Sequence, residues 1–119
     1  MRAAEGWGKI DIEVAEASLA AGVFSACLYE DGRLIGFGRV IGDGVLYFYV
    51  QDLIVRPPHR GRGLGRRLME HLLSKIKAAA APGASVCLMA SKGREDFYRS
   101  FGFTVRPNAR FGAGMILVL

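Results

Sequence analysis

Apolar positions between residues 23 and 55 fall into three runs that short polar turns separate. Each run is long enough for a strand, and the runs are Val23–Tyr29, Leu34–Ile41 and Val45–Val55. Asp31-Gly32 lies between the first two, and this dipeptide is typical of a type I′ hairpin turn because both central residues need positive φ. Gly42-Asp43-Gly44 separates the second run from the third. The pattern predicts an antiparallel meander.

After residue 55 the period changes from that of a strand to that of a helix. Apolar residues recur at every fourth position, at Leu64, Leu68, Leu72 and Ile76, and polar residues occupy the other face. Pro82-Gly83 ends this predicted helix, and the apolar run Ser85–Ala90 follows it. A strand reached through a helix is expected to lie parallel to the preceding strand, by a right-handed crossover.

Weaker patterns flank this centre. Asp11 is a suitable cap for a short helix that ends near Gly22. Lys92–Phe101 predicts a second short helix, with Gly102 just beyond its end. Two further apolar segments, Phe103–Arg106 and Met115–Leu119, predict a final hairpin, whereas Met1–Lys9 does not have the pattern of a strand. The predicted class is α+β.

Composition adds limits on the class of protein. A chain of 119 residues, 51% apolar and 23% charged, fits one compact domain. It opens with no signal peptide, and no apolar run approaches the ~20 residues of a membrane span, so we expect a cytoplasmic protein. Cys27 and Cys87 lie in apolar runs without metal-ligand spacing, which favours buried free thiols and leaves a disulfide between them open.

The formal charge of +5 suggests a polyanionic partner. Nucleic acid and a phosphorylated small molecule both fit, and so does a merely solvated basic face. Charge alone does not choose among these three interpretations.

The sharpest local feature is the loop Arg60-Gly61-Arg62-Gly63-Leu64-Gly65, between a strand and an amphipathic helix. Unpaired helix N–H groups, a permissive backbone and guanidinium groups together favour a phosphate-bearing ligand. The dinucleotide pattern GxGxxG fails, because Arg66 stands where the third glycine is needed, and the Walker pattern is absent. What remains is the pattern R-x-x-G-x-G.

This pattern resembles the acyl-CoA-binding motif [QR]-x-x-G-x-[GA] of the GNAT acetyltransferase superfamily. A second segment, Phe97–Phe103, is similar to the family's F-Y-x-x-x-G-F pattern. The resemblance covers roughly residues 23–103. It implies a GNAT-like α+β fold, with a mixed, mostly antiparallel central sheet, a βαβ acyl-CoA-binding core and flanking helices. Residues 1–119 would be one N-acetyltransferase domain, in which the usual first strand is either missing or supplied by a partner or by an upstream start.

The resemblance also implies where acetyl-CoA binds. Backbone N–H groups and Arg side chains of the loop would hold its pyrophosphate, through Arg60, Gly61, Arg62, Gly63, Gly65 and Arg66. The backbone of the preceding strand would hold the pantetheine arm, through Leu53, Ile54 and Val55. In the family this strand splays from its parallel neighbour. The alternative is that the glycines only permit a tight turn and the apolar side chains are only core.

Two residues carry the chemistry that the resemblance implies. Tyr98 matches the tyrosine that protonates the leaving thiolate, and its alternative role is packing with Phe97 and Phe101. Asp52 is the carboxylate nearest to a water-positioning site, which Gln51 occupies here. Strand alternation places Asp52 and Gln51 on opposite faces unless a bulge intervenes. Asp52 could equally be a structural carboxylate.

We therefore predict an acetyl-CoA-dependent N-acetyltransferase that acts on a primary amine of a small molecule in a ternary complex. We expect no metal, no nucleic acid and no membrane among its partners, and leave a homodimer open. The alternative is a non-catalytic acyl-CoA-binding or protein-partner module on the same fold. A nucleic-acid binder ranks last, because it rests on net charge alone.

Overall fold

The computed structural model describes residues 11–119, so the expectation of a missing first strand, at Met1–Lys9, lies outside the described residues. The described chain forms two compact units. The first unit ends at Leu88, and the second unit is Met89–Leu119.

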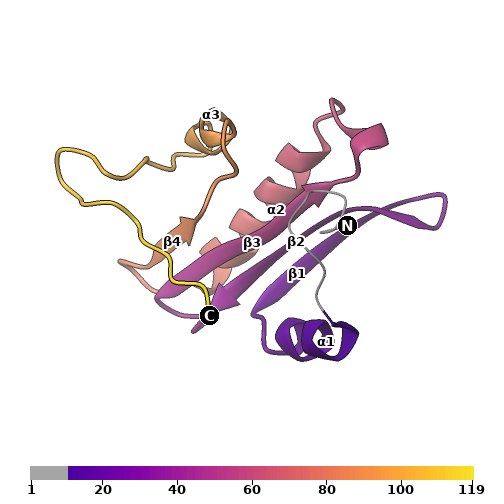
Figure 1. Ribbon diagram of the computed structural model, residues 1–119, viewed down its shortest axis with the longest axis horizontal. Coiled ribbons are helices and arrows are strands. Elements are labelled where there is room, and N and C mark those ends of the chain that lie inside the picture. Colours follow the sequence, from indigo (N-terminus) through magenta and orange to yellow (C-terminus); the bar gives the residue numbers. More distant parts are fainter. Residues whose placement is uncertain (1–10) are drawn as a thin grey trace. The chain divides into compact units, whose positions relative to one another are not determined.

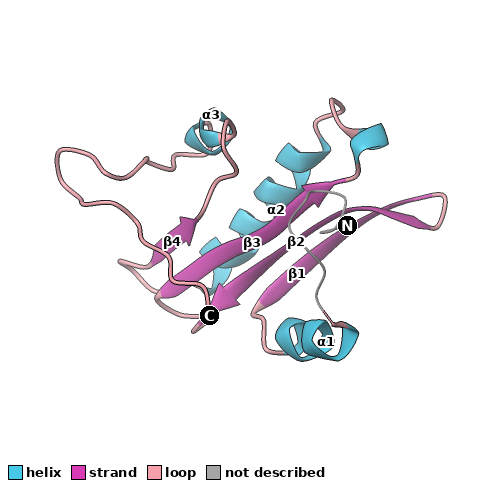
Figure 2. Ribbon diagram, viewed as in Figure 1, coloured by secondary structure: helices cyan, strands magenta, loops and turns pink. Residues whose placement is uncertain are grey.

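The first unit contains a four-stranded sheet in the order β1-β2-β3-β4 (Figures 1 and 2). Its strands are β1 (Phe24–Glu30), β2 (Arg33–Gly42), β3 (Tyr47–Val55) and β4 (Ser85–Leu88). The first three pair antiparallel, and β4 pairs parallel to β3. The predicted meander and the predicted parallel strand are both confirmed.

The two turns of the meander follow from their residues. Glu30 pairs with Arg33 across Asp31 (φ 50°) and Gly32 (φ 76°), which confirms the tight hairpin. At the second turn, the Asp43 carboxylate accepts hydrogen bonds from the backbone N–H groups of Val45, Leu46 and Tyr47, at 2.8–3.0 Å. These three bonds lower the pKa of Asp43 below its ordinary value.

Helix α2 (Leu64–Ala79) packs against β1, β2 and β3 and supplies half of the core. Gly38 of β2 lets it approach closely, because an added Cβ there would lie 2.9 Å from Leu53 Cδ1 and 3.0 Å from Leu72 Cδ1. The buried apolar residues are Ile35, Val40, Phe48, Val50, Ile54, Leu64, Leu68, Met69, Leu72 and Ile76. The predicted amphipathic helix is confirmed.

Helix α1 (Ile12–Ala20) precedes β1, and the Asp11 side chain caps it by accepting a 3.0 Å hydrogen bond from Glu13 N. This confirms the predicted cap. No helix among the described residues is long and apolar enough to cross a membrane.

A β-bulge interrupts the pairing of β2 with β3. Phe37 pairs with Ile54 and Arg39 with Gln51, so Gly38 stands opposite two residues, Asp52 and Leu53. Asp52 has φ 55°, which is uncommon for a residue with a side chain. The bulge turns the Asp52 carboxylate to the same side as the side chains of Arg39 and Gln51.

The second unit contains one helix, α3 (Glu95–Arg99), which is shorter than the predicted Lys92–Phe101. The predicted strands at Phe103–Arg106 and Met115–Leu119 are wrong, since no strand forms in residues 89–119. Apolar composition gives a segment strand propensity, but a strand also needs a partner for its backbone groups.

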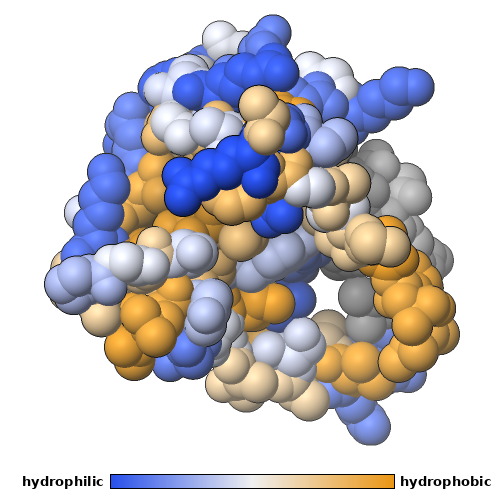
Figure 3. Space-filling view, turned by 90° about the vertical axis from the view of Figure 1, so that its left-hand side faces the viewer, coloured by the Kyte–Doolittle hydropathy of each residue, from blue (hydrophilic) through white to orange (hydrophobic). Residues whose placement is uncertain are grey.

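The C-terminal segment of this unit is exposed. Side chains from Met115 to Leu119 have relative exposures of 72–112%. The face of the molecule in Figure 3 shows apolar side chains exposed among strongly hydrophilic ones. Earlier in the segment, Asn108 Oδ1 accepts hydrogen bonds from the N–H groups of Arg110 and Phe111, both at 2.9 Å.

Both cysteines are free, as expected, but both are exposed rather than buried. Burial alternates along β1 and β4, and Cys27 and Cys87 occupy exposed positions of that alternation. An apolar run predicted the strands correctly but did not indicate which face each thiol occupies.

Candidate functional site

The segment between β3 and α2 folds as two successive turns. A short 3-10 turn, Pro57–His59, follows the end of the strand. Its hydrogen bonds run from His59 N to Arg56 O at 2.9 Å and from Arg60 N to Pro57 O at 3.2 Å. The loop 60–63 then leads into the helix.

The start of α2 has the geometry of an anion site. Gly63 is the N-cap, in the left-handed conformation (φ 74°), and no side chain caps the first turn. The first hydrogen bond of the helix runs from Arg67 N to Gly63 O at 3.1 Å. The backbone N–H groups of the three residues before Arg67 lie ahead of this bond, at the open end of the helix. These groups and the positive end of a 16-residue helix dipole favour an anion.

The loop backbone is also accessible. Gly61 has φ 80°, and an added Cβ at Gly61 or Gly63 would meet no described atom within 4 Å. The positive φ shows that both glycines serve the turn. The open space beside them leaves room for a ligand to reach the backbone.

The arginine side chains of the loop turn toward other parts of the protein. Arg60 Nε donates to Val55 O at 2.9 Å, and Arg66 Nη1 lies 3.8 Å from Glu70 Oε1. Arg62 Nη1 and Nη2 donate to Glu30 Oε2 and Oε1 at 3.2 and 3.0 Å. Each of the three guanidinium groups has a protein partner.

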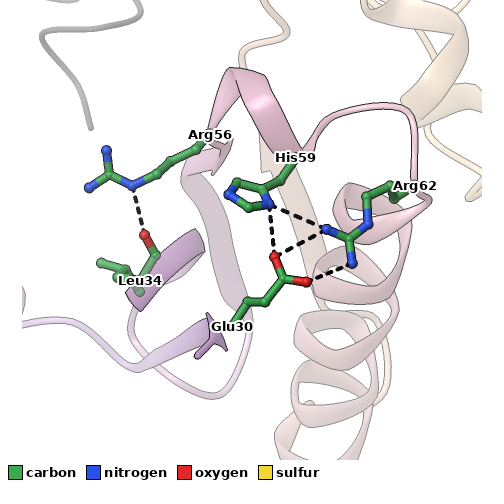
Figure 4. A network of polar contacts seen from close by, with 5 residues as sticks. All are labelled: Glu30, Leu34, Arg56, His59 and Arg62. Atoms are coloured by element: carbon green, nitrogen blue, oxygen red, sulfur yellow. Dashed lines mark hydrogen bonds and ion pairs between the residues drawn. The ribbon is translucent and has the colours of Figure 1, made fainter. Parts of the chain in front are cut away.

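Glu30 is a residue that the sequence did not single out. It lies at the end of β1, and its carboxylate contacts both Arg62 and His59 (Figure 4). Hydrogen bonding with Arg62 and the nearby charges of Arg62 and His59 lower the pKa of Glu30. Glu30 and Arg62 are 32 positions apart in the sequence, which explains why no local pattern revealed the contact.

The parallel pairing of β3 with β4 ends before the bulge. Pairing of the two parallel strands covers Tyr47–Val50 against Ser85–Leu88 and ends there. Leu53, Ile54 and Val55 therefore have no partner from β4 among the described strands. The side chain of Ile54 is buried, in keeping with its alternative role as core.

Asp52 is buried with a relative exposure of 8% and is held by side chains on its own face of the sheet. Arg39 Nε donates to Oδ2 at 3.2 Å, and Gln51 Nε2 donates to Oδ1 at 3.3 Å. Arg39 Nη1 also donates to Ser18 Oγ of α1 at 3.0 Å. A carboxylate, an amide and a guanidinium are thus fixed beside the strand edge.

Tyr98 lies in the second unit, on α3, where it is half-buried. Its ring packs edge-on against Phe97 and Phe103, with centroids 5.0 and 6.1 Å apart. Desolvation raises the pKa of its hydroxyl, so Tyr98 keeps its proton at neutral pH.

Among the described residues, no group of three or more His, Cys, Asp or Glu side chains could hold a metal ion.

Comparison with known families decides what this loop and fold represent. The model of the acetyltransferase (GNAT) domain matches residues 22–105, from the start of the sheet to just beyond α3. The chain belongs to the GNAT acetyltransferase family. This confirms the resemblance and the predicted α+β fold class.

Relatives and solved structures agree with the assignment to GNAT. The chain is 37% identical to serotonin N-acetyltransferase 2, chloroplastic, from Oryza sativa over 66% of this chain and 38% of that protein. It is 31% identical to an uncharacterized ycf52-like N-acetyltransferase from Prochlorococcus marinus over 86% of this chain and 58% of that protein. The chain thus spans less than two thirds of either relative.

Two bacterial structures extend the comparison over nearly the whole chain. A probable acetyltransferase of unknown function from meticillin-resistant Staphylococcus aureus has a TM-score of 0.87 and 34% identity, and covers 99% of this chain and 87% of that one. A GNAT family acetyltransferase from Streptococcus pneumoniae has a TM-score of 0.81 and 30% identity, over 99% and 85%.

Within this GNAT fold, the predicted site residues fall into groups. The predicted cofactor residues lie at the end of β3, in the loop 60–63 and in the first turn of α2, and the 3-10 turn joins the strand to the loop. Asp52 precedes them on β3, and Tyr98 belongs to the other compact unit. Glu30 and Arg39, which sequence reasoning missed, are the partners of Arg62 and Asp52.

Proposed function

We propose that this GNAT chain is an acetyl-CoA-dependent N-acetyltransferase that transfers the acetyl group to a primary amine of a small molecule. The observation that carries the proposal is the start of α2, where an uncapped helix end follows two glycines with positive φ and open space beside them. An anionic pyrophosphate suits that place.

The cofactor residues have separate tasks. The N–H groups of Gly61, Arg62, Gly63, Gly65 and Arg66 would hold the pyrophosphate. The β3 edge at Leu53, Ile54 and Val55, where β4 no longer pairs, would bind the pantetheine amides. Acetyl-CoA would supply an activated thioester at that edge.

The acceptor side rests on Asp52 and Gln51. A protonated amine must lose a proton before it attacks, and Asp52 would accept it, directly or through a water that Gln51 orients. Tyr98 would give its proton to the departing thiolate, which its raised pKa permits by keeping the hydroxyl protonated. Direct attack in a ternary complex needs no covalent intermediate on the enzyme.

One observation favours the alternative, a non-catalytic acyl-CoA-binding or protein-partner module. Both oxygens of Asp52 accept hydrogen bonds, from Arg39 and from Gln51, as a structural carboxylate would. Such a module would bind acetyl-CoA without turnover.

Two measurements on the intact protein test the proposal. Saturating acetyl-CoA should raise the thermal unfolding temperature, and free thiol should be released when a suitable amine is added. The panel should include amino acids, polyamines and aryl-ethylamines such as serotonin, because a relative carries serotonin in its name. No thermal shift would refute the proposal, while a shift without thiol release across the panel would favour the non-catalytic module.

A further inference from the structure

Glu30, His59 and Arg62 form a cluster of polar contacts beside the loop that precedes α2 (Figure 4). Glu30 takes both terminal nitrogens of Arg62 in a bidentate pair, at 3.0 and 3.2 Å. His59 Nδ1 lies 3.0 Å from Glu30 Oε2 and 3.3 Å from Arg62 Nη1. Nδ1 donates to the Glu30 carboxylate when it carries a proton and accepts from Arg62 when it does not, so His59 has a partner in the cluster in either tautomer.

The cluster joins segments that are distant in sequence. Glu30 ends β1 at the tight hairpin, His59 ends the 3-10 turn, and Arg62 stands between the two glycines with positive φ. One carboxylate therefore holds both sides of the loop 60–61. The hairpin that carries Glu30 is fixed to the end of β3 in turn, since Arg56 Nε donates to Leu34 O at 2.7 Å (Figure 4).

These contacts have a consequence for ligand binding. Gly61 and Gly63 make the loop backbone permissive, and a permissive loop loses conformational entropy when a ligand orders it. Side-chain contacts that fix the loop beforehand reduce that loss and so raise affinity. The Arg62 side chain, being committed to Glu30, leaves the backbone N–H groups to face the ligand.

We propose that Glu30 is a positioning residue for the cofactor loop. It clamps Arg62 and His59, so that the backbone N–H groups at the start of α2 are arranged for a diphosphate before the diphosphate arrives. Arg62 acts through Glu30 rather than as a direct phosphate ligand. This inference rests on the proposed function, because it requires that the loop binds acetyl-CoA.

Glu30→Gln tests the clamp, because the sign of its effect separates two models. The clamp predicts that the Kd and KM for acetyl-CoA rise by about 5- to 10-fold, within the range of modest preorganisation effects, while kcat changes little. If Glu30 instead competes with phosphate for Arg62, the variant binds acetyl-CoA more tightly. Tighter binding or unchanged binding would each overturn the inference.

Glu70→Gln is the matched control. Glu70 is another exposed carboxylate near the loop, 3.8 Å from Arg66 and one helical turn further along, and its removal changes the net charge by the same amount. It should leave affinity for the anionic cofactor unchanged or slightly improved. A loss of affinity equal to that of Glu30→Gln would overturn the clamp, since neither effect would then be specific.

A double-variant cycle completes the experiment. If Arg62 acts through Glu30, then Arg62→Gln weakens binding as much as Glu30→Gln, and the double variant is no weaker than either. A much larger loss for Arg62→Gln would make Arg62 a phosphate ligand and overturn the inference. Failure of the wild type and of Glu70→Gln to bind acetyl-CoA would refute the proposed function itself, which is a distinct outcome.

Discussion

Two arginine–carboxylate pairs stand near opposite ends of the segment that carries the proposed cofactor site. Arg39–Asp52 lies at the β3 bulge, with side-chain exposures of 13% and 8%. Arg62–Glu30 lies at the loop before α2, with exposures of 49% and 38%. Their N···O distances are nearly equal, at 3.2 and 3.0 Å. The pairs differ in burial, and also in geometry, because Arg62 is bidentate to Glu30 whereas Arg39 contacts Asp52 through Nε.

Because the two pairs differ in burial, the loss of each pair should be detected by a different measurement. Removing one partner of a buried pair leaves a desolvated charge and destabilises the fold, whereas an exposed pair contributes about 0–1 kcal/mol. Arg39–Asp52 should therefore be visible in the free energy of unfolding. Arg62–Glu30 should be visible in ligand binding and almost absent from stability.

The largest expected effect comes from a residue outside both pairs, and it is an effect on turnover rather than on stability. On the proposed mechanism, Tyr98→Phe removes the proton donor for the thiolate, and kcat should fall by on the order of 10²–10⁴. The rise in unfolding temperature caused by acetyl-CoA should persist. Tyr29→Phe is the control, because Tyr29 is 66% exposed and has no proposed role. Equal turnover for Tyr98→Phe and wild type would remove Tyr98 from the mechanism.

Asp52→Asn tests whether the buried pair also takes part in chemistry. The amide can still accept a hydrogen bond from Arg39 but cannot accept a proton from the amine. We expect kcat to fall by about 10²-fold, near the lower end of what a general base contributes, with acetyl-CoA affinity unchanged. Thiol-release kinetics and calorimetric titration would measure the two quantities. A variant with full turnover and lower stability would make Asp52 purely structural.

Arg39→Gln breaks the buried pair from the other side. Asp52 then loses its cation while it remains buried, and the free energy of unfolding should fall by about 2–4 kcal/mol. Denaturant titration would measure this loss. The comparison predicts a much smaller loss for Arg62→Gln, because both members of its pair are exposed to solvent. Equal losses for the two variants would contradict the distinction drawn from burial.

A double variant sharpens the same point. Arg39→Gln with Asp52→Asn removes both charges, so its loss should be smaller than the sum of the single losses. Ser18→Ala accounts separately for the hydrogen bond that Arg39 donates to α1. Additive losses would show that Arg39 and Asp52 stabilise the fold independently.

Gly63→Val perturbs the loop backbone directly. A residue with a side chain at φ 74° has about 1–3 kcal/mol of backbone strain. The loop can relieve this strain by adopting another backbone conformation. Affinity for acetyl-CoA should fall by roughly 10- to 100-fold, as titration would show. Gly83→Val is a matched control, because Gly83 has φ 83°, similar open space and a position beyond the other end of α2. An equal loss of affinity in both variants would point to general strain.

The same contrast between local and distant causes explains which features the sequence predicted. Asp31-Gly32 and the period of α2 act within a few residues, and both predictions are confirmed. Asp52 faces Gln51 only because the bulge exists, and its partner Arg39 lies on another strand. The contact of Glu30 with Arg62 crosses 32 residues and left no local pattern.

The failed predictions share a physical reason. Met115–Leu119 has the composition of a strand, but pairing depends on a neighbour that composition cannot specify. Cys27 lies in an apolar run, and its exposure depends on which face of β1 meets α2. In both cases the segment's own residues leave the decisive contact undetermined.

The smallest expected effect is the pH dependence of the exposed pair. The pKa of Glu30 is lowered from the ordinary value of 4.5, chiefly by its hydrogen bonds with Arg62, so the folded state favours the charged carboxylate. The pair's contribution is therefore complete above about pH 4.5 and is lost as pH falls through the lower folded-state pKa. The difference in unfolding temperature between wild type and Glu30→Gln should be small at pH 7 and should shrink further as pH falls through the lowered pKa of Glu30. A difference that grows on acidification would mean that the charged form of Glu30 is not the stabilising one, and that burial is the wrong basis for comparing the two pairs.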